Sequence, residues 1–245
     1  TMVMNLLNLF NPKRWLDCSA GWGDRLIGAL AYGKCDYVGV DPSKCMRPVY
    51  KTIIDELKDP DSSHRYEVMC DGFENVEFDK ESFDLVFTSP PFFDLEVYED
   101  EEGQSIKKFG TPDDWKEQFL FPLIEKSYQS LEVGGHLALY ITDVPNYSYI
   151  DDMKSHIKTE IKGLTYSGDV NWQNQTGHKK IRTIFIWKKI SSDLKTDMPQ
   201  ISVPVMKSEP LDINLEELNE SHKDCYYRIS NLDNVKKWMG QGEGL

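Results

Sequence analysis

The chain has 245 residues, and its 40% hydrophobic and 12% aromatic content predicts one large domain, or a domain with an appendage, around a buried core. The formal net charge of −13 is spread along the chain, which argues against a protein that holds nucleic acid through a global basic surface. No apolar stretch approaches the ~20 residues that span a bilayer, and five scattered cysteines without a CxxC pair disfavour a zinc site and suit a reducing compartment.

Strands alternate with helices over the first 141 residues. The expected strands are short apolar runs, and they cover residues 14–18, 37–41, 66–70, 83–88 and 136–141. Apolar residues at helical spacing predict helices over 2–10 and 24–32 and a third helix with Pro48 near its first turn. This alternation predicts an α/β fold on a mainly parallel, doubly wound sheet.

The second half of the chain adds a long helix and a strand pair. Thr111-Pro112-Asp113-Asp114 is typical of a helix start, with an N-cap, an early proline and two carboxylates. We expect this helix to kink at Pro122 and to be broken by Gly134-Gly135. Residues 164–172 and 182–189 predict an antiparallel pair that closes the sheet.

The residue pattern of the chain changes after Ile190, where prolines appear and the apolar residues show no clear period. We therefore expect one folded domain over 1–190. Residues 191–245 form a C-terminal extension in this interpretation, either a strap along the surface or a helical appendage.

A glycine-containing loop, residues 17–25, lies between the first strand and its helix. Gly21 and Gly23 let the backbone approach a ligand, and the helix N-terminus offers free N–H groups. Asp41 ends the second strand, where a carboxylate can accept both hydroxyls of a ribose. NAD-binding folds use the same geometry, and an acid at a strand end also caps the next helix, so this pair alone leaves the ligand open.

A proline turn follows the fourth strand, at Thr88-Ser89-Pro90-Pro91-Phe92. Two prolines end the strand and hold the backbone in an extended turn. A small polar side chain, two rigid carbonyls and an aromatic ring are thereby placed at the carboxyl edge of the sheet, where open α/β sheets bind ligands.

This turn resembles the (Asp/Asn/Ser)-Pro-Pro-(Tyr/Phe) signature of S-adenosylmethionine-dependent amino-methyltransferases, which methylate exocyclic amines of nucleobases. Residues 17–25 are similar to the acidic-x-Gly-x-Gly-x-Gly loop of the same enzymes, with Ser19 at the first glycine position. The resemblance covers about residues 12–190. It implies a Rossmann-like methyltransferase fold with a mainly parallel seven-stranded sheet and an antiparallel closing strand.

The resemblance also implies roles for individual residues. The residues implied to bind S-adenosylmethionine, from its methionine end through its ribose to its adenine, are Asp17, Ser19, Gly21, Gly23, Asp41, Asp71 and Gly72. In the catalytic set Ser89, Pro90, Pro91 and Phe92, the Ser89 side chain and the Pro90 carbonyl accept the two N–H groups of the amine, and Phe92 stacks on a flipped base. No metal is expected.

The expected substrate is a DNA base. Serine in the motif favours cytosine N4 over adenine N6 mildly, and residues 94–98 with Gln104, Ser105 and Trp115 resemble phage and bacterial DNA modification methylases. We accordingly expect a cytoplasmic enzyme in a bacterial or viral host, or a nuclear one in a eukaryote. The negative charge suggests a basic partner protein that supplies nucleic-acid affinity. An RNA base, a protein amide or a non-catalytic binding subunit remain as alternatives.

Overall fold

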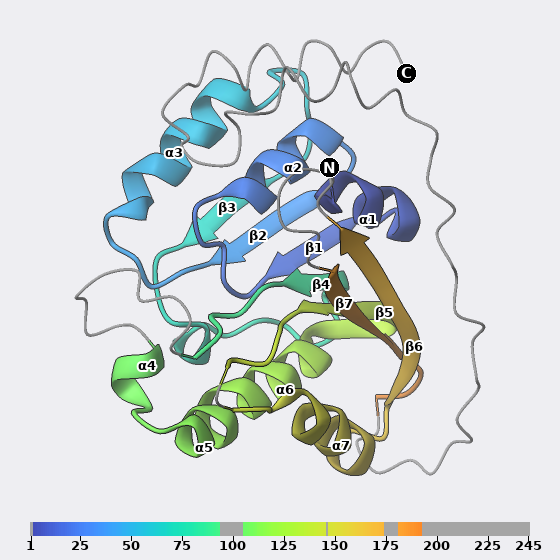
Figure 1. Ribbon diagram of the computed structural model, residues 1–245. Coiled ribbons are helices and arrows are strands. Elements are labelled where there is room, and N and C mark those ends of the chain that lie inside the picture. Colours follow the sequence, from blue (N-terminus) through green and yellow to red (C-terminus); the bar gives the residue numbers. More distant parts are fainter. Residues whose placement is uncertain (1, 94–104, 146, 174–180, 193–245) are drawn as a thin grey trace. The chain divides into compact units, whose positions relative to one another are not determined.

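The computed structural model describes residues 2–93, 105–145, 147–173 and 181–192 (Figure 1). The strands are β1 (Arg14–Asp17), β2 (Asp36–Val40), β3 (Tyr66–Met69), β4 (Phe83–Thr88), β5 (Leu131–Tyr140), β6 (Leu164–Gln173) and β7 (Ile181–Lys189). The α-helices are α1 (Met2–Phe10), α2 (Asp24–Tyr32), α3 (Met46–Leu57), α4 (Ser105–Lys108), α5 (Pro112–Trp115), α6 (Phe121–Ser130) and α7 (Ile150–Glu160). A 3-10 turn, η1 (Phe73–Asn75), and a π-helical turn, η2 (Lys116–Leu120), complete the list.

All seven strands form one sheet in the order β3-β2-β1-β4-β5-β7-β6. The first five strands run parallel to one another, and β7 runs antiparallel between β5 and β6. The chain moves outward from β1 to β3 and then returns to place β4 on the other side of β1. This reversal puts the carboxyl ends of β1 and β4 side by side and opens a crevice between their loops. The predicted sheet is confirmed.

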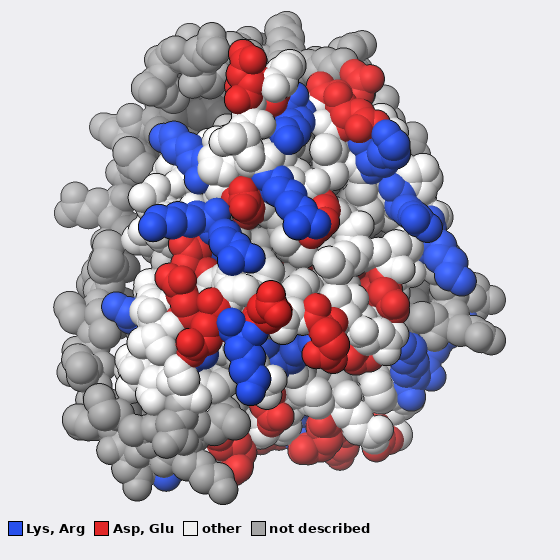
Figure 2. All heavy atoms as spheres, turned by 180° about the vertical axis from the view of Figure 1, so that it is seen from behind, with Lys and Arg blue, Asp and Glu red and all other residues white. Residues whose placement is uncertain are grey.

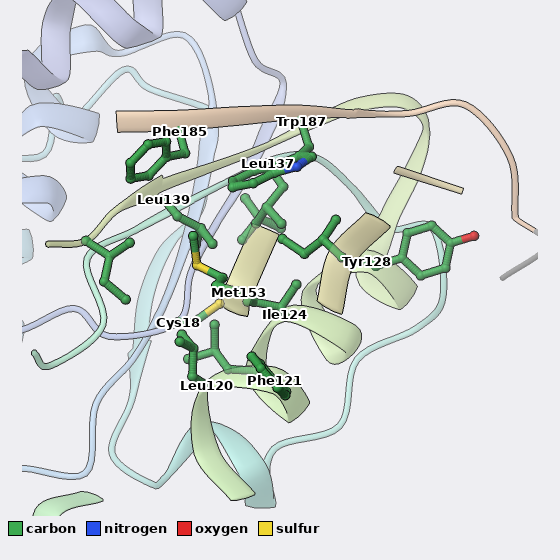
Figure 3. Close-up of a cluster of buried hydrophobic side chains, with 14 of the residues drawn as sticks. Cys18, Leu120, Phe121, Ile124, Tyr128, Leu137, Leu139, Met153, Phe185 and Trp187 are labelled. Carbon is green, nitrogen blue, oxygen red and sulfur yellow. The ribbon is translucent and has the colours of Figure 1, made fainter. Parts of the chain in front are cut away.

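Helices cover both faces of the sheet, with α1, α2 and α3 on one face and α5, α6 and α7 on the other (Figure 1). Close approach of α1 to α2 depends on Gly28, because a Cβ there would lie 2.4 Å from Val3 Cγ1. On the opposite face, Leu137 and Leu139 of β5 and Trp187 of β7 lie toward α6 and α7 (Figure 3). Within the described ranges, no helix is long and apolar enough to cross a membrane.

The expected helix start at Thr111 is confirmed, because Thr111 Oγ1 accepts a hydrogen bond from the backbone N–H of Asp114 at 3.1 Å. The helix that follows is irregular just before Pro122. Its middle is the π-helical turn η2, and Pro122 lies in the first turn of α6. A wider turn leaves one carbonyl free of the usual donor, which suits a residue without an N–H group.

The prediction for Gly134-Gly135 was wrong. The preceding helix already ends at Ser130, and β5 begins at Leu131, so both glycines lie inside the strand. Pairing with β4 shifts between Phe83 and Leu85, and the extra β5 residues form a bulge in which Gly134 takes a φ of +96°. Glycine in a strand marks such irregularities.

One helix exceeds the prediction, and the predicted extension is not tested. Helix α7 was not expected from the sequence, and it packs against α6 and β6. The expected extension over 191–245 lies, apart from its first two residues, outside the described residues.

The end of β7 is held by a buried lysine. Lys189 is only 2% exposed, and its Nζ donates to the backbone oxygens of Tyr128 at 3.1 Å and Leu131 at 2.6 Å. The ammonium also lies 4.4 Å from the centre of the Tyr128 ring and 3.2 Å from Glu81 Oε1. These contacts satisfy carbonyls at the junction of α6 and β5 and attach β7 to that junction.

We expect Lys189→Met to lower the free energy of unfolding by roughly 1.5–3 kcal/mol, because two buried carbonyls lose a charged donor. Urea denaturation measures the change. Lys188→Met is the matched control, since Lys188 is exposed, and its effect should stay within about 0.5 kcal/mol. Equal effects of the two substitutions would contradict the role given to Lys189.

Candidate active site

A pocket of about 230 Å³ opens at the carboxyl edge of the sheet, where the strand order reverses. Its wall comes from the loops that follow β1, β2, β3 and β4, with α4 and η2. Of the residues singled out in the sequence, those that line this wall are Ser19, Gly21, Asp41, Gly72, Ser89 and Pro91. Those that do not line it are Asp17, Gly23, Asp71, Pro90 and Phe92.

Asp41 presents a carboxylate in the pocket wall. Its Oδ2 accepts from the backbone N–H of Gly21 at 2.8 Å, and its Oδ1 accepts from that of Ser43 at 3.0 Å. The side chain is 9% exposed, and no ion pair forms with it among the residues that the structure describes. Burial raises the pKa of Asp41, although the two backbone N–H groups act against the increase. Each oxygen retains lone pairs that a ligand hydroxyl can use.

Asp17, by contrast, is 0% exposed and does not line the pocket. Its Oδ2 accepts from Arg25 Nε at 2.7 Å and from Tyr37 Oη at 2.8 Å. Its Oδ1 accepts from Thr88 Oγ1 at 2.9 Å and from the backbone N–H of Ser19 at 3.3 Å. The resemblance implied a ligand contact for this acid, whereas here its oxygens are occupied by protein donors.

Arg25 pairs with Asp17 and lines the pocket, and no sequence motif pointed to it. Its side chain is 15% exposed and lines the wall, and its guanidinium also donates to the carbonyl of Ser19. Burial acts to lower the pKa of Arg25, but the charge and hydrogen bond of Asp17 raise it overall. A guanidinium offers five N–H donors, so Arg25 keeps donors for an anionic group in the pocket.

The loop between β1 and α2 needs glycine at two positions. Gly21 has a φ of +59°, and its carbonyl accepts a hydrogen bond from Tyr50 Oη. Gly23, the N-cap of α2, has a φ of +87°, and a Cβ there would lie 2.9 Å from Ile53 Cδ1 of α3. Gly23 therefore shapes the pocket by close packing of α2 on α3 rather than by forming its wall.

The turn after β3 presents the expected Gly72 to the pocket but not the expected Asp71. Asp71 is exposed and accepts from its own neighbours, the backbone N–H of Gly72 at 2.7 Å and Asn75 Nδ2 at 2.8 Å. These bonds lower the pKa of Asp71. Gly72, Phe73 and Glu74 line the pocket instead. Asp71 thus holds the turn, and the residues after it meet the ligand space.

The proline turn is anchored to the buried network. Thr88, which precedes it, donates to Asp17, and Trp15 Nε1 donates to the carbonyl of Phe87 at 2.9 Å. Ser89 and Pro91 then line the pocket. Phe92 is 7% exposed, and its ring packs edge-on against Tyr140 with centroids 5.5 Å apart. In this arrangement Phe92 borders the pocket without entering it.

Several wall residues escaped the sequence analysis because they are ordinary core types in the sequence. The apolar ones on the side of α4 and η2 are Phe93, Ile106, Phe109 and Phe119. Phe93 follows the proline turn with a φ of +44°, which is an unusual backbone conformation for a residue other than glycine and was not predicted from the sequence. Trp22, in the loop between β1 and α2, also lines the pocket and is 54% exposed.

Cys18 also lies in the wall but is unsuited to nucleophilic chemistry. Its side chain is buried, and its Sγ lies 3.5 Å from Ser127 Oγ. Burial raises the pKa of this thiol, so the thiolate form is disfavoured. In the described part of the chain, no group of three or more His, Cys, Asp or Glu side chains is arranged to hold a metal ion.

No model of a known protein family matches the chain. No curated protein matches it either. Among solved structures, an rRNA methylase from Streptococcus thermophilus is 16% identical with a TM-score of 0.51, over 78% of this chain and 96% of that one. A candidate RNA methyltransferase from Pyrococcus horikoshii is 15% identical with a TM-score of 0.51, over 78% and 83%.

A candidate class I S-adenosylmethionine-dependent methyltransferase from Listeria monocytogenes is 17% identical with a TM-score of 0.55, over 82% of this chain and 62% of that one. At these identities the similarity concerns the fold. The chain has the Rossmann-like fold of the class I S-adenosylmethionine-dependent methyltransferases, as the resemblance implied.

We expect Asp17→Asn to lower the free energy of unfolding by roughly 3–5 kcal/mol, because the buried Arg25 guanidinium loses its counter-charge. Asp24→Asn is the control, since the exposed Asp24 is another acid near Arg25, and it should cost at most about 1 kcal/mol. Urea denaturation measures both. An Asp17→Asn variant of unchanged stability would show that the network does not support the fold.

Proposed function

We propose that this chain transfers a methyl group from S-adenosylmethionine to an exocyclic amine of a nucleobase in DNA, at cytosine N4 or adenine N6. One observation carries the proposal: Ser89 of the proline turn and the carboxylate of Asp41 line the same pocket. A nicotinamide site would account for Asp41 and the glycine loop, but it gives no reason for the rigid serine-proline turn beside them.

The donor set of the pocket fits the cofactor. Asp41 suits the two ribose hydroxyls, because it is held by backbone N–H groups and forms no ion pair with a described residue. Among the described residues that line the pocket, Arg25 is the one with a cationic side chain. Its guanidinium suits the carboxylate of the cofactor. Gly72 and Phe73 offer an apolar edge for adenine. S-adenosylmethionine, when bound, supplies a methyl group activated by its sulfonium.

The chain's own residues then prepare the amine. Its lone pair is conjugated into the base, so the nitrogen must be drawn toward tetrahedral geometry by groups that accept its N–H bonds. In this proposal Ser89 Oγ and the carbonyl of Pro90 are those acceptors. Pro90 and Pro91 keep the acceptors in place before the substrate arrives. Thr88 links the proline turn to Asp17 by a hydrogen bond. This bond fixes the position of the turn relative to the loop between β1 and α2.

The choice of nitrogen over carbon follows from the cysteines. Methylation at pyrimidine C5 requires a thiolate that attacks C6, and the cysteine in the wall, Cys18, is a buried thiol with a raised pKa. The proline turn itself contains no cysteine. The base must also leave its stack to reach the pocket, as in other enzymes that modify bases.

DNA is favoured by the resemblance of residues 94–98 to DNA modification methylases, although that segment lies outside the described residues. An RNA base is the second candidate. It is favoured by two structural neighbours, one described as an rRNA methylase and one as a candidate RNA methyltransferase. Both candidates require the same acceptors at Ser89 and Pro90.

The charge of the chain bears on how it would hold nucleic acid. On the face shown in Figure 2, lysine and arginine side chains are interspersed with aspartate and glutamate and form no broad basic area. With a net charge of −13, the chain should bind duplex DNA weakly by itself. We therefore keep a basic partner protein as part of the proposal.

Loss of the ribose contact should weaken cofactor binding. We expect Asp41→Ala to reduce the free energy of S-adenosylmethionine binding by roughly 1.5–3 kcal/mol in calorimetry, because charge-assisted hydrogen bonds are removed. Asp36→Ala is the matched control, since Asp36 lies at the amino end of the same strand, away from the pocket. Equal affinity of wild type and Asp41→Ala would remove Asp41 from the binding site.

Loss of the amine acceptor should affect turnover instead. We expect Ser89→Ala to lower methyl transfer on the order of 10²-fold with cofactor affinity almost unchanged. Ser82→Ala, at the amino end of β4, serves as control. Labelled cofactor with DNA, RNA and protein panels, followed by mass spectrometry of the products, tests the proposal itself. An N-methylated base supports it, whereas 5-methylcytosine alone, or cofactor binding without transfer to any substrate, would overturn it.

A further inference from the structure

We propose that Tyr140, Arg182 and Trp172, here called the edge stack, bind an unpaired nucleotide next to the target base in single-stranded or locally opened DNA. This inference rests on the proposed function and adds a binding surface to it. The surface lies outside the pocket, since none of its three residues lines the wall.

The edge stack is an arginine with two aromatic rings. Arg182 Cζ lies 5.3 Å from the centre of the Trp172 ring and 6.0 Å from that of Tyr140. The strand register explains why the three meet. Trp172 of β6 is directly opposite Arg182 of β7, and Tyr140 of β5 is opposite Ile184, two residues further along β7. Residues at these positions share one face of the sheet.

The edge stack continues the proline turn. Pro91 lines the pocket, and the next residue, Phe92, packs its ring against Tyr140 at 5.5 Å. A row of side chains therefore runs from the pocket border across the ends of β4, β5, β7 and β6. A strand of nucleic acid whose target base entered the pocket could place a neighbouring nucleotide along this row.

The chemistry of the row suits a nucleotide. Aromatic rings and planar guanidinium groups stack on bases of any sequence, and a guanidinium also attracts phosphate. All three side chains of the edge stack are partly exposed. In a chain with 41 acidic and 28 basic residues, Arg182 forms no ion pair with a carboxylate in the part of the chain that the structure describes. Its charge is thus left for a partner group of opposite sign.

The stability of the β6–β7 hairpin explains the edge stack less well than ligand binding does. The β6–β7 pair is already held by a backbone ladder from Leu164 to Gln173, which is interrupted by a register shift between Tyr166 and Gly168. The buried core residues of β7 lie on both faces, with Ile184 and Ile186 on the face of the edge stack and Phe185 and Trp187 toward α6 and α7 (Figure 3), and they do not include Arg182. The cation between two rings is therefore better explained by a ligand than by the fold.

The test measures binding separately from catalysis. Fluorescence anisotropy with the full chain and a labelled single-stranded DNA oligonucleotide at low salt should give roughly 5- to 100-fold weaker binding for Arg182→Ala and Trp172→Ala than for wild type. Arg182→Lys, which keeps the charge but loses the planar group, should show an intermediate loss. Cofactor affinity and melting temperature are measured for every variant and should not change.

Arg14→Ala is the matched control. Arg14 also lies over an aromatic ring, with its Cζ 5.3 Å from the centre of Phe83, but it is at the amino end of β1. Its substitution should leave DNA binding unchanged. Equal losses in Arg14→Ala and Arg182→Ala would mean that any arginine contributes through general charge, and this would overturn the edge stack as a site.

The remaining outcomes separate this inference from the proposed function. Unchanged DNA binding in the edge-stack variants, together with normal methyl transfer, would overturn the inference and leave the function intact. Loss of binding in those variants, with no methyl transfer by wild type to any substrate, would support the surface and refute the function. Wild-type binding to single-stranded RNA but not to DNA would overturn the commitment to DNA.

Discussion

Much of the site depends on one buried carboxylate, that of Asp17. It accepts hydrogen bonds from α2 through Arg25, from β2 through Tyr37 and from the end of β4 through Thr88. These elements meet where the strand order reverses. The bonds that neutralise the buried charge therefore also set the distance between the β1–α2 loop and the proline turn. A buried acid is costly without such partners, which makes the arrangement of the donors as important as the acid.

In the hydrogen-bond network around Asp17, support of the site and contact with the ligand space fall to different residues, whereas the sequence motif assigns both to one residue. Asp17 holds Arg25 in position, whereas Arg25 itself lines the pocket. The turn after β3 shows the same division, since Asp71 holds the backbone and Gly72, Phe73 and Glu74 form the wall. Lys126 adds a further support, because its Nζ donates to the carbonyl of Phe73 at 2.9 Å. Rigid support behind a small set of ligand-facing groups is what a site needs for precise alignment of reacting atoms.

The functional proposal rests on the site rather than on the fold, because one fold carries many activities and the structural neighbours share under a fifth of their residues with this chain. In the proposed function, the carboxylate of Asp41 suits a ligand with a diol, and the rigid serine-proline turn beside it suits a substrate with a planar amine. The closing hairpin then extends the same edge with aromatic rings and an arginine. An acidic chain that approaches nucleic acid would rely on such stacking more than on charge.

The sequence by itself determined the order of the five parallel strands, the closing pair, the start of the helix at Thr111 and the proline turn, because periodicity, capping residues and prolines act locally. It also predicted Asp41 as a strand-end acid, and Asp41 lines the pocket. It did not predict the short helix α4. Tertiary structure alone decided that Asp17 is buried, that Arg25 is the cation in the wall and that Phe92 turns toward Tyr140. It also decided that Gly134-Gly135 lie in a bulge of β5. These outcomes depend on which distant side chains meet, and a pattern of neighbouring residues carries no information about such contacts.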